Sequence, residues 1–161
     1  MDIFADSDAF RIAGLPLHPL LVHAVVVLTP LTALAVAIAA VWPSARRRLG
    51  YAPPVAALLV AGLVPITVLA GQELADTVGE TPAIERHEEL GLMLIPWTIA
   101  LLIASVAVAV IDRMPPARRP TPLTRAAAMI VPALAVVTAV GTIVVTVLTG
   151  DAGARAVWEG V

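Results

Sequence analysis

One uncharged stretch decides the fold of this chain. Residues 12–45 read IAGLPLHPLLVHAVVVLTPLTALAVAIAAVWPSA and contain no acidic or basic residue. A helix of about 20 apolar residues is long enough to cross the roughly 30 Å hydrocarbon core of a membrane. The stretch therefore predicts a transmembrane helix at about residues 19–42.

Three further uncharged runs follow along the chain, at residues 49–72, 90–111 and 126–150. They predict transmembrane helices at about 52–75, 89–111 and 125–148. The chain is 60% apolar and 14% charged, whereas soluble domains are about half apolar and a quarter charged. We therefore expect an all-α fold, an integral membrane four-helix bundle that forms one domain over residues 1–161.

Basic residues are concentrated on one side of the predicted membrane. The loops that join helices one to two and three to four hold seven of the ten arginines and one of the twelve acidic residues. The two termini and the loop between helices two and three hold the other three arginines and eleven acids. Because cytoplasmic loops carry an excess of positive charge, we expect both termini on the outer side of the membrane.

Missing residue types exclude several kinds of chemistry. The chain has no cysteine, which excludes disulfides, iron–sulfur clusters, thiolate metal sites and covalent c-type haem attachment. It also has no lysine, so a Schiff base or a Walker-type phosphate loop is excluded. A net charge of −2 gives no case for nucleic acid as a partner. We find no nucleophile–base motif, and the sequence therefore does not support an enzyme.

The candidate site lies at the outer end of the predicted bundle. All three histidines, His18, His23 and His87, fall at this level, together with Glu73 and Asp151. An ionisable group within a membrane span is by default a hypothesis for a functional site. The pattern leaves three interpretations open: axial ligands of haem b, a zinc or other transition-metal site completed by carboxylates, or purely structural histidines.

The spacing of the histidines favours one pair. His18 and His23 point about 140° apart on a regular helix, so they do not share a face. We therefore expect His23 to pair with His87 across helices, with His18 as the alternative to either. Glu73 or Asp151 would then accept a hydrogen bond from the second imidazole nitrogen and fix its tautomer.

A weak internal repeat is also suggested. Predicted helices one and three both begin beside a histidine and both end before a loop rich in arginine and proline. This arrangement predicts a parallel repeat about an axis along the membrane normal.

Three segments resemble a known family of bacterial membrane proteins, domain of unknown function 2231. Residues 17–23, LHPLLVH, resemble its H-P-x-x-V-H signature. Residues 86–91, RHEELG, resemble its histidine followed by Leu-Gly, and residues 149–158, TGDAGARAVW, are similar to its terminal G-x-x-G-x-x-x-V-aromatic segment. Two positions depart from the pattern: Ala24-Val25 replace the frequent Phe-Pro, and Asp151 replaces a frequent histidine, which removes one candidate ligand.

The resemblance implies four membrane helices and a place in the bacterial cytoplasmic membrane, in contact with the lipid bilayer. Relatives of this family that are fused to, or encoded beside, Rieske-type redox domains imply an electron-transfer setting. The resulting hypothesis is a small subunit that binds haem b through His23 and His87 and exchanges electrons with a redox partner. The alternatives are a non-catalytic interaction or assembly subunit, including a homo-oligomer, and an outer-face metal-binding protein that uses His18, His23 and His87.

Overall fold

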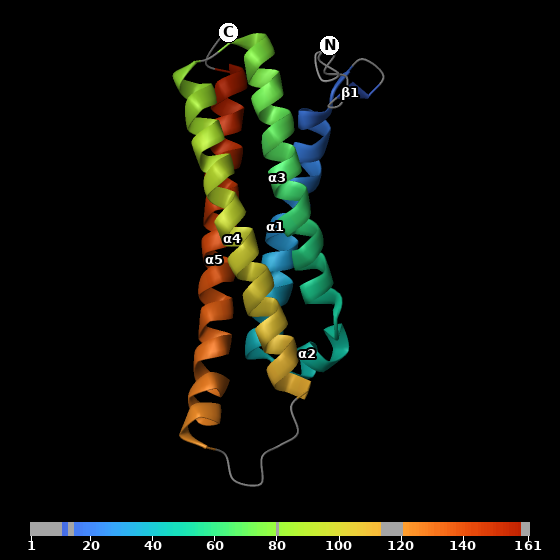
Figure 1. The fold of residues 1–161 in the computed structure, drawn as a ribbon, viewed down its shortest axis with the longest axis vertical. Helices are drawn as coiled ribbons and strands as arrows, with labels where there is room; N and C mark the ends of the chain where they lie inside the picture. The colour runs from blue at the N-terminus through green and yellow to red at the C-terminus, as the bar shows by residue number, and fades with distance from the viewer. Residues whose placement is uncertain (1–10, 13–14, 80, 114–120, 159–161) are drawn as a thin grey trace, which may run out of the picture.

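The chain folds into long helices. The computed structural model describes residues 11–12, 15–79, 81–113 and 121–158. Its elements are β1 (Arg11–Ile12), β2 (Leu15–Pro16), α1 (Leu17–Val41), α2 (Pro43–Leu49), α3 (Ala52–Val78), α4 (Pro82–Arg113) and α5 (Pro122–Trp158) (Figure 1). The four long helices α1, α3, α4 and α5 are each long and apolar enough to cross a membrane. The expected all-helical architecture with four apolar spans is therefore confirmed.

The long helices run past the predicted spans. We expected α4 to begin near residue 89 and α5 to end near residue 148, but they begin at Pro82 and end at Trp158. Charged residues mark where the membrane ends and do not stop a helix, so uncharged runs underestimate helix length. The short helix α2 and the two-residue pair β1–β2 were not expected from the sequence.

The four long helices form a ring. Each packs on its two neighbours in the order α1, α3, α4, α5, and α1 also touches α4 across the centre. α1 and α4 run in one direction and α3 and α5 in the other, so α1 begins and α5 ends at the same end of the bundle (Figure 1). We call this the histidine end, after His18 and His87, and the opposite end the arginine end, after Arg46 and Arg113.

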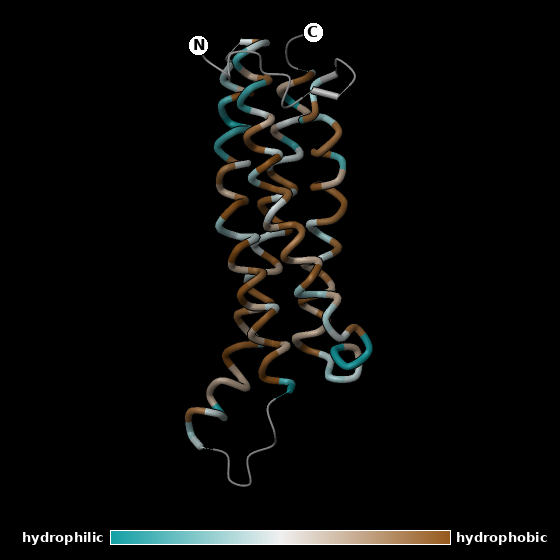
Figure 2. Tube along the Cα trace, turned by 45° about the vertical axis from the view of Figure 1, so that its right-hand side comes forward, coloured by the Kyte–Doolittle hydropathy of each residue, from teal (hydrophilic) through white to brown (hydrophobic). Residues whose placement is uncertain are grey.

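The interior is built largely from small and branched apolar residues. Near the arginine end, Ala33, Ala135 and Ala139 are fully buried around Leu101. Small side chains let helix backbones approach closely, which is how membrane helices pack when lipid is as apolar as the core. Figure 2 shows hydrophobic residues along the length of the bundle and hydrophilic segments gathered toward its two ends.

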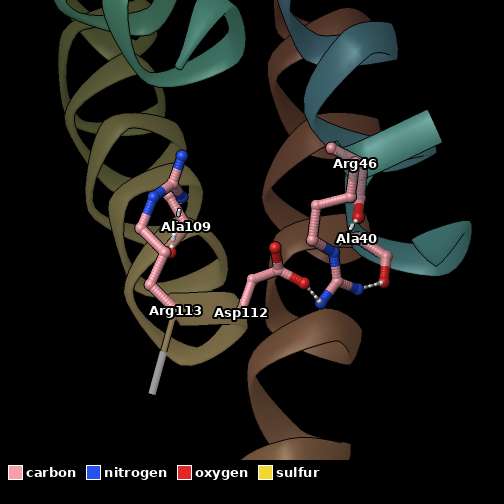
Figure 3. Close-up of polar contacts among 6 residues, drawn as sticks. Ala40, Arg46, Ala109, Asp112 and Arg113 are labelled. Carbon is pink, nitrogen blue, oxygen red and sulfur yellow. Dashed lines mark hydrogen bonds and ion pairs between the residues drawn. The ribbon is translucent and has the colours of Figure 1, made fainter. Parts of the chain in front are cut away.

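Arg46 contacts both α1 and α4 at the arginine end (Figure 3). Its Nε donates to the carbonyl of Ala39 at 2.6 Å and its Nη2 to the carbonyl of Ala40 at 2.7 Å. The last carbonyls of a helix have no partner within the helix, so Arg46 caps the C-terminus of α1. Its Nη1 also lies 3.6 Å from Oδ1 of Asp112 on α4, which joins the ends of the two helices.

Candidate functional site

Two of the three histidines meet inside the histidine end. The ring centroids of His18 on α1 and His87 on α4 lie 6.0 Å apart, with the ring planes at 81°. Both side chains are half-buried. Since α1 and α4 are diagonal helices of the ring, the two imidazoles approach each other across the centre of the bundle.

Each imidazole is fixed by a backbone carbonyl. His18 Nδ1 lies 2.8 Å from the carbonyl oxygen of Thr67 on α3, and His87 Nδ1 lies 2.9 Å from that of Thr149 on α5. A carbonyl oxygen only accepts, so Nδ1 carries the hydrogen and donates in both rings. The neutral tautomer then leaves Nε2 with a free lone pair on each ring, as in histidines that bind metals.

A glycine makes room for each ring. A Cβ added at Gly71 would lie 2.7 Å from Cε1 of His18, and one added at Gly153 would lie 2.8 Å from Cε1 of His87. Each glycine follows the threonine of the same site by four residues, in the segments TVLAG (67–71) and TGDAG (149–153). The same three-part arrangement of histidine, carbonyl and glycine therefore occurs twice.

The duplication extends over both helix pairs. When α1 is aligned on α4 at the two histidines, and α3 on α5 at the two threonines, buried residues fall on buried residues. Matched pairs are Val25 with Leu94, Thr29 with Thr98, Ala40 with Ala109, Ala57 with Ala139, Val60 with Thr142, and Ala70 with Ala152. The contacts and the register thus support the parallel repeat that the sequence suggested, with α1–α3 as one unit and α4–α5 as the other.

A cavity of about 490 Å³ borders both histidines. Residues from all four long helices line it, and most are apolar, such as Val22, Val64 and Leu94. This volume lies in the range of about 300–1,000 Å³ found for ligand pockets, which are typically apolar with a few polar groups. One histidine comes from each helix pair, so both repeat units contribute an imidazole to the lining of the cavity.

One polar pair stands on the cavity wall. Gln72 on α3 donates through Nε2 to Oε1 of Glu88 on α4 at 2.7 Å, and both residues line the cavity. This hydrogen bond joins the two repeat units beside His87.

The expected pairing of His23 with His87 is wrong, since His87 faces His18 instead. His23 is exposed, and its Nδ1 bonds to the carbonyl of Pro19 in its own helix. The reason is helical register. His18 precedes the buried Val25 by seven residues, about two turns, and shares its face, whereas His23 precedes it by two and points the other way.

The two carboxylates expected behind the histidines do not take that position. Thr67 and Thr149 supply the acceptors through their carbonyls. Glu73 is half-buried on α3 and lies outside the set of residues that line the cavity. Asp151 is exposed and forms an ion pair with Arg155 at 2.9 Å.

A metal site built from many side chains is not found in the part of the chain that the structure describes. No group of three or more histidine, cysteine, aspartate or glutamate residues comes close enough there to hold an ion. What the site offers is two imidazoles, one from each repeat unit, that line the same cavity.

The fold and the site define a class of protein: a four-helix membrane protein with a histidine-bordered cavity near one end of its bundle. Residues 14–161 match the family described as predicted membrane protein (DUF2231). The chain belongs to this family. No curated protein and no solved structure matches it.

Proposed function

We propose that the chain is an electron-transfer subunit that binds haem b in the cavity, where His18 and His87 would hold the iron. The observation that carries the proposal is the pair of imidazoles, 6.0 Å apart and one from each repeat unit, that border a mostly apolar cavity of about 490 Å³. His87 was expected as a ligand from the sequence, and His18 takes the place first given to His23.

The residues fit this group. Imidazole nitrogens bind metal ions at about 2 Å, and the 6.0 Å between the ring centroids of His18 and His87 would leave room for one ion between them. Donation from Nδ1 to the carbonyls of Thr67 and Thr149 leaves Nε2 of both rings available as a ligand. Haem held between helices of a bundle by histidines is an established arrangement.

Bound haem would supply reversible one-electron oxidation and reduction of its iron. The chain itself would orient the two imidazoles through the backbone of α3 and α5 and would surround the group with valine and leucine side chains. An apolar surround keeps water out and lowers the local dielectric constant, both of which influence a reduction potential. The absence of a nucleophile–base motif agrees with a carrier of electrons rather than a catalyst.

We also infer that the histidine end faces the outer side of a bacterial cytoplasmic membrane. The arginine end carries Arg46, Arg47 and Arg48, with Arg113 beside them, and positively charged loops remain on the cytoplasmic side. Electrons would then be exchanged with a redox partner at the outer surface.

The optical spectrum of the purified protein, expressed with added haem precursor, tests the proposal. We expect a Soret band in the wild type, its loss or a strong decrease in His18→Ala and in His87→Ala, and its retention in His23→Ala. His23 is the matched control because it is the remaining histidine of the chain and is exposed. A wild type without a Soret band contradicts haem binding, and loss of the band only in His23→Ala contradicts the assigned ligands.

A further inference from the structure

Apart from the two histidines, Glu88 is the one ionisable side chain among the described residues that line the cavity. In the alignment that matches the histidines and threonines, Glu88 corresponds to Pro19 and Gln72 corresponds to Ala154. The bonded pair of Gln72 and Glu88 thus has no counterpart between α1 and α5. The cavity carries a carboxylate beside His87 and none at the equivalent position beside His18.

No cation among the described residues forms an ion pair with this carboxylate. Within the described residues, the ion pairs of the histidine end join Arg86 to Glu89 and Arg155 to Asp151, and none includes Glu88. Glu88 accepts instead from the neutral amide of Gln72. That bond fixes the carboxylate on the wall of a mostly apolar cavity, where a charge acts more strongly than in water.

A fixed negative charge favours the more positive state of a nearby redox centre. We propose that the negative charge of Glu88, which Gln72 holds in place, lowers the reduction potential of the centre bound between His18 and His87. This inference rests on the proposed function. It goes further in assigning the tuning of the reduction potential to the carboxylate on the cavity wall, which has no equivalent in the other repeat unit.

Redox titration of the full-length, haem-loaded protein tests this assignment, with Glu88→Gln as the first variant. Glutamine keeps the shape of the side chain and its capacity to accept a hydrogen bond, but it removes the charge. We expect the equilibrium constant for reduction to rise about tenfold, which corresponds to about 59 mV for one electron. Glu89→Gln is the matched control, because it makes the same change one residue away, where the carboxylate is exposed and paired with Arg86, and it leaves the potential near that of the wild type.

A second variant covers the case in which Glu88→Gln does not accumulate as folded protein. Gln72→Arg places a cation beside an unchanged Glu88 and should raise the potential in the same direction. Equal potentials for the wild type and the folded variant overturn the role of Glu88 while leaving haem binding intact. A wild type that takes up no haem overturns both the proposed function and this inference.

Discussion

At the scale of single residues, backbone carbonyls accept the hydrogen bonds from the two histidines, a role that we expected for acidic side chains. Carbonyls of Thr67 and Thr149 orient His18 and His87, and Gly71 and Gly153 let the rings lie against the neighbouring helices. A carbonyl on a rigid helix holds an imidazole in one orientation without placing a charge in an apolar interior. The two histidines are therefore fixed before any ligand binds.

Replacing Gly71 by alanine should displace His18. The new Cβ would stand 2.7 Å from Cε1 and 2.9 Å from Nδ1 of the ring, so the bond to Thr67 must lengthen or break. We expect a loss of about 1–3 kcal/mol in the free energy of unfolding, as for other overpacked interiors. Chemical denaturation in detergent micelles measures it.

Gly62→Ala on the same helix is the control, since a Cβ there meets no atom within 4 Å. Alanine favours a helix over glycine by up to about 1 kcal/mol, so this variant should be neutral or more stable. Equal stabilities of Gly71→Ala and Gly62→Ala would contradict the close packing of His18 on α3.

At the scale of helices, the arginine end is held by a cap and an ion pair. Arg46 bonds the last carbonyls of α1 and approaches Asp112 of α4, and the guanidinium of Arg113 lies 3.8 Å from the ring centroid of Tyr51. In the sequence, the run of three arginines signals only topology. The structure adds a structural role for the first of them.

Arg46→Gln should weaken the contact between α1 and α4. It removes two charge-assisted hydrogen bonds and leaves carbonyls of Ala39 and Ala40 without this partner, which costs about 1–3 kcal/mol of stability. Thermal unfolding in detergent, compared with Arg47→Gln, measures the effect. Arg47 is exposed, so an equal loss of stability in both variants would contradict the capping role.

At the scale of the whole molecule, two similar helix pairs line a shared cavity at the histidine end. The spans and the all-helical fold could be predicted, because long uncharged runs in a chain this apolar have few other solutions. The same runs also predicted that the three histidines lie near one end of the bundle. The internal repeat could be predicted only in outline. The T-x-x-x-G segments at 67–71 and 149–153 were the signal that could have located the carbonyl and the glycine beside each histidine.

The partner of His87 could not be predicted from spacing alone. Four apolar helices carry no polar face to show which side is buried, so both His18 and His23 were possible partners of His87. In the structure, the buried Val25 shows which face of α1 points inward. The hydrogen bond between Gln72 and Glu88 could not be predicted from the sequence either, because it depends on how α3 and α4 pack against each other.

The proposed orientation can be tested by labelling single cysteines, because the chain contains none. Glu85→Cys places a thiol at the histidine end, and Ser44→Cys places one at the arginine end; both positions are exposed. A membrane-impermeant maleimide added to intact spheroplasts should label Glu85→Cys, and Ser44→Cys only after the membrane is opened. The reverse pattern would contradict an outward-facing histidine end.

Low-temperature electron paramagnetic resonance of the oxidised, haem-loaded protein tests the central claim most directly. A haem iron held by two imidazoles whose planes are nearly perpendicular gives a strongly anisotropic low-spin signal, and the ring planes of His18 and His87 lie at 81° to each other. We predict this signal in the wild type and in His23→Ala, and its loss in His18→Ala and His87→Ala. A wild type that binds no haem, or one that shows only a high-spin signal, would contradict a centre held by these two histidines.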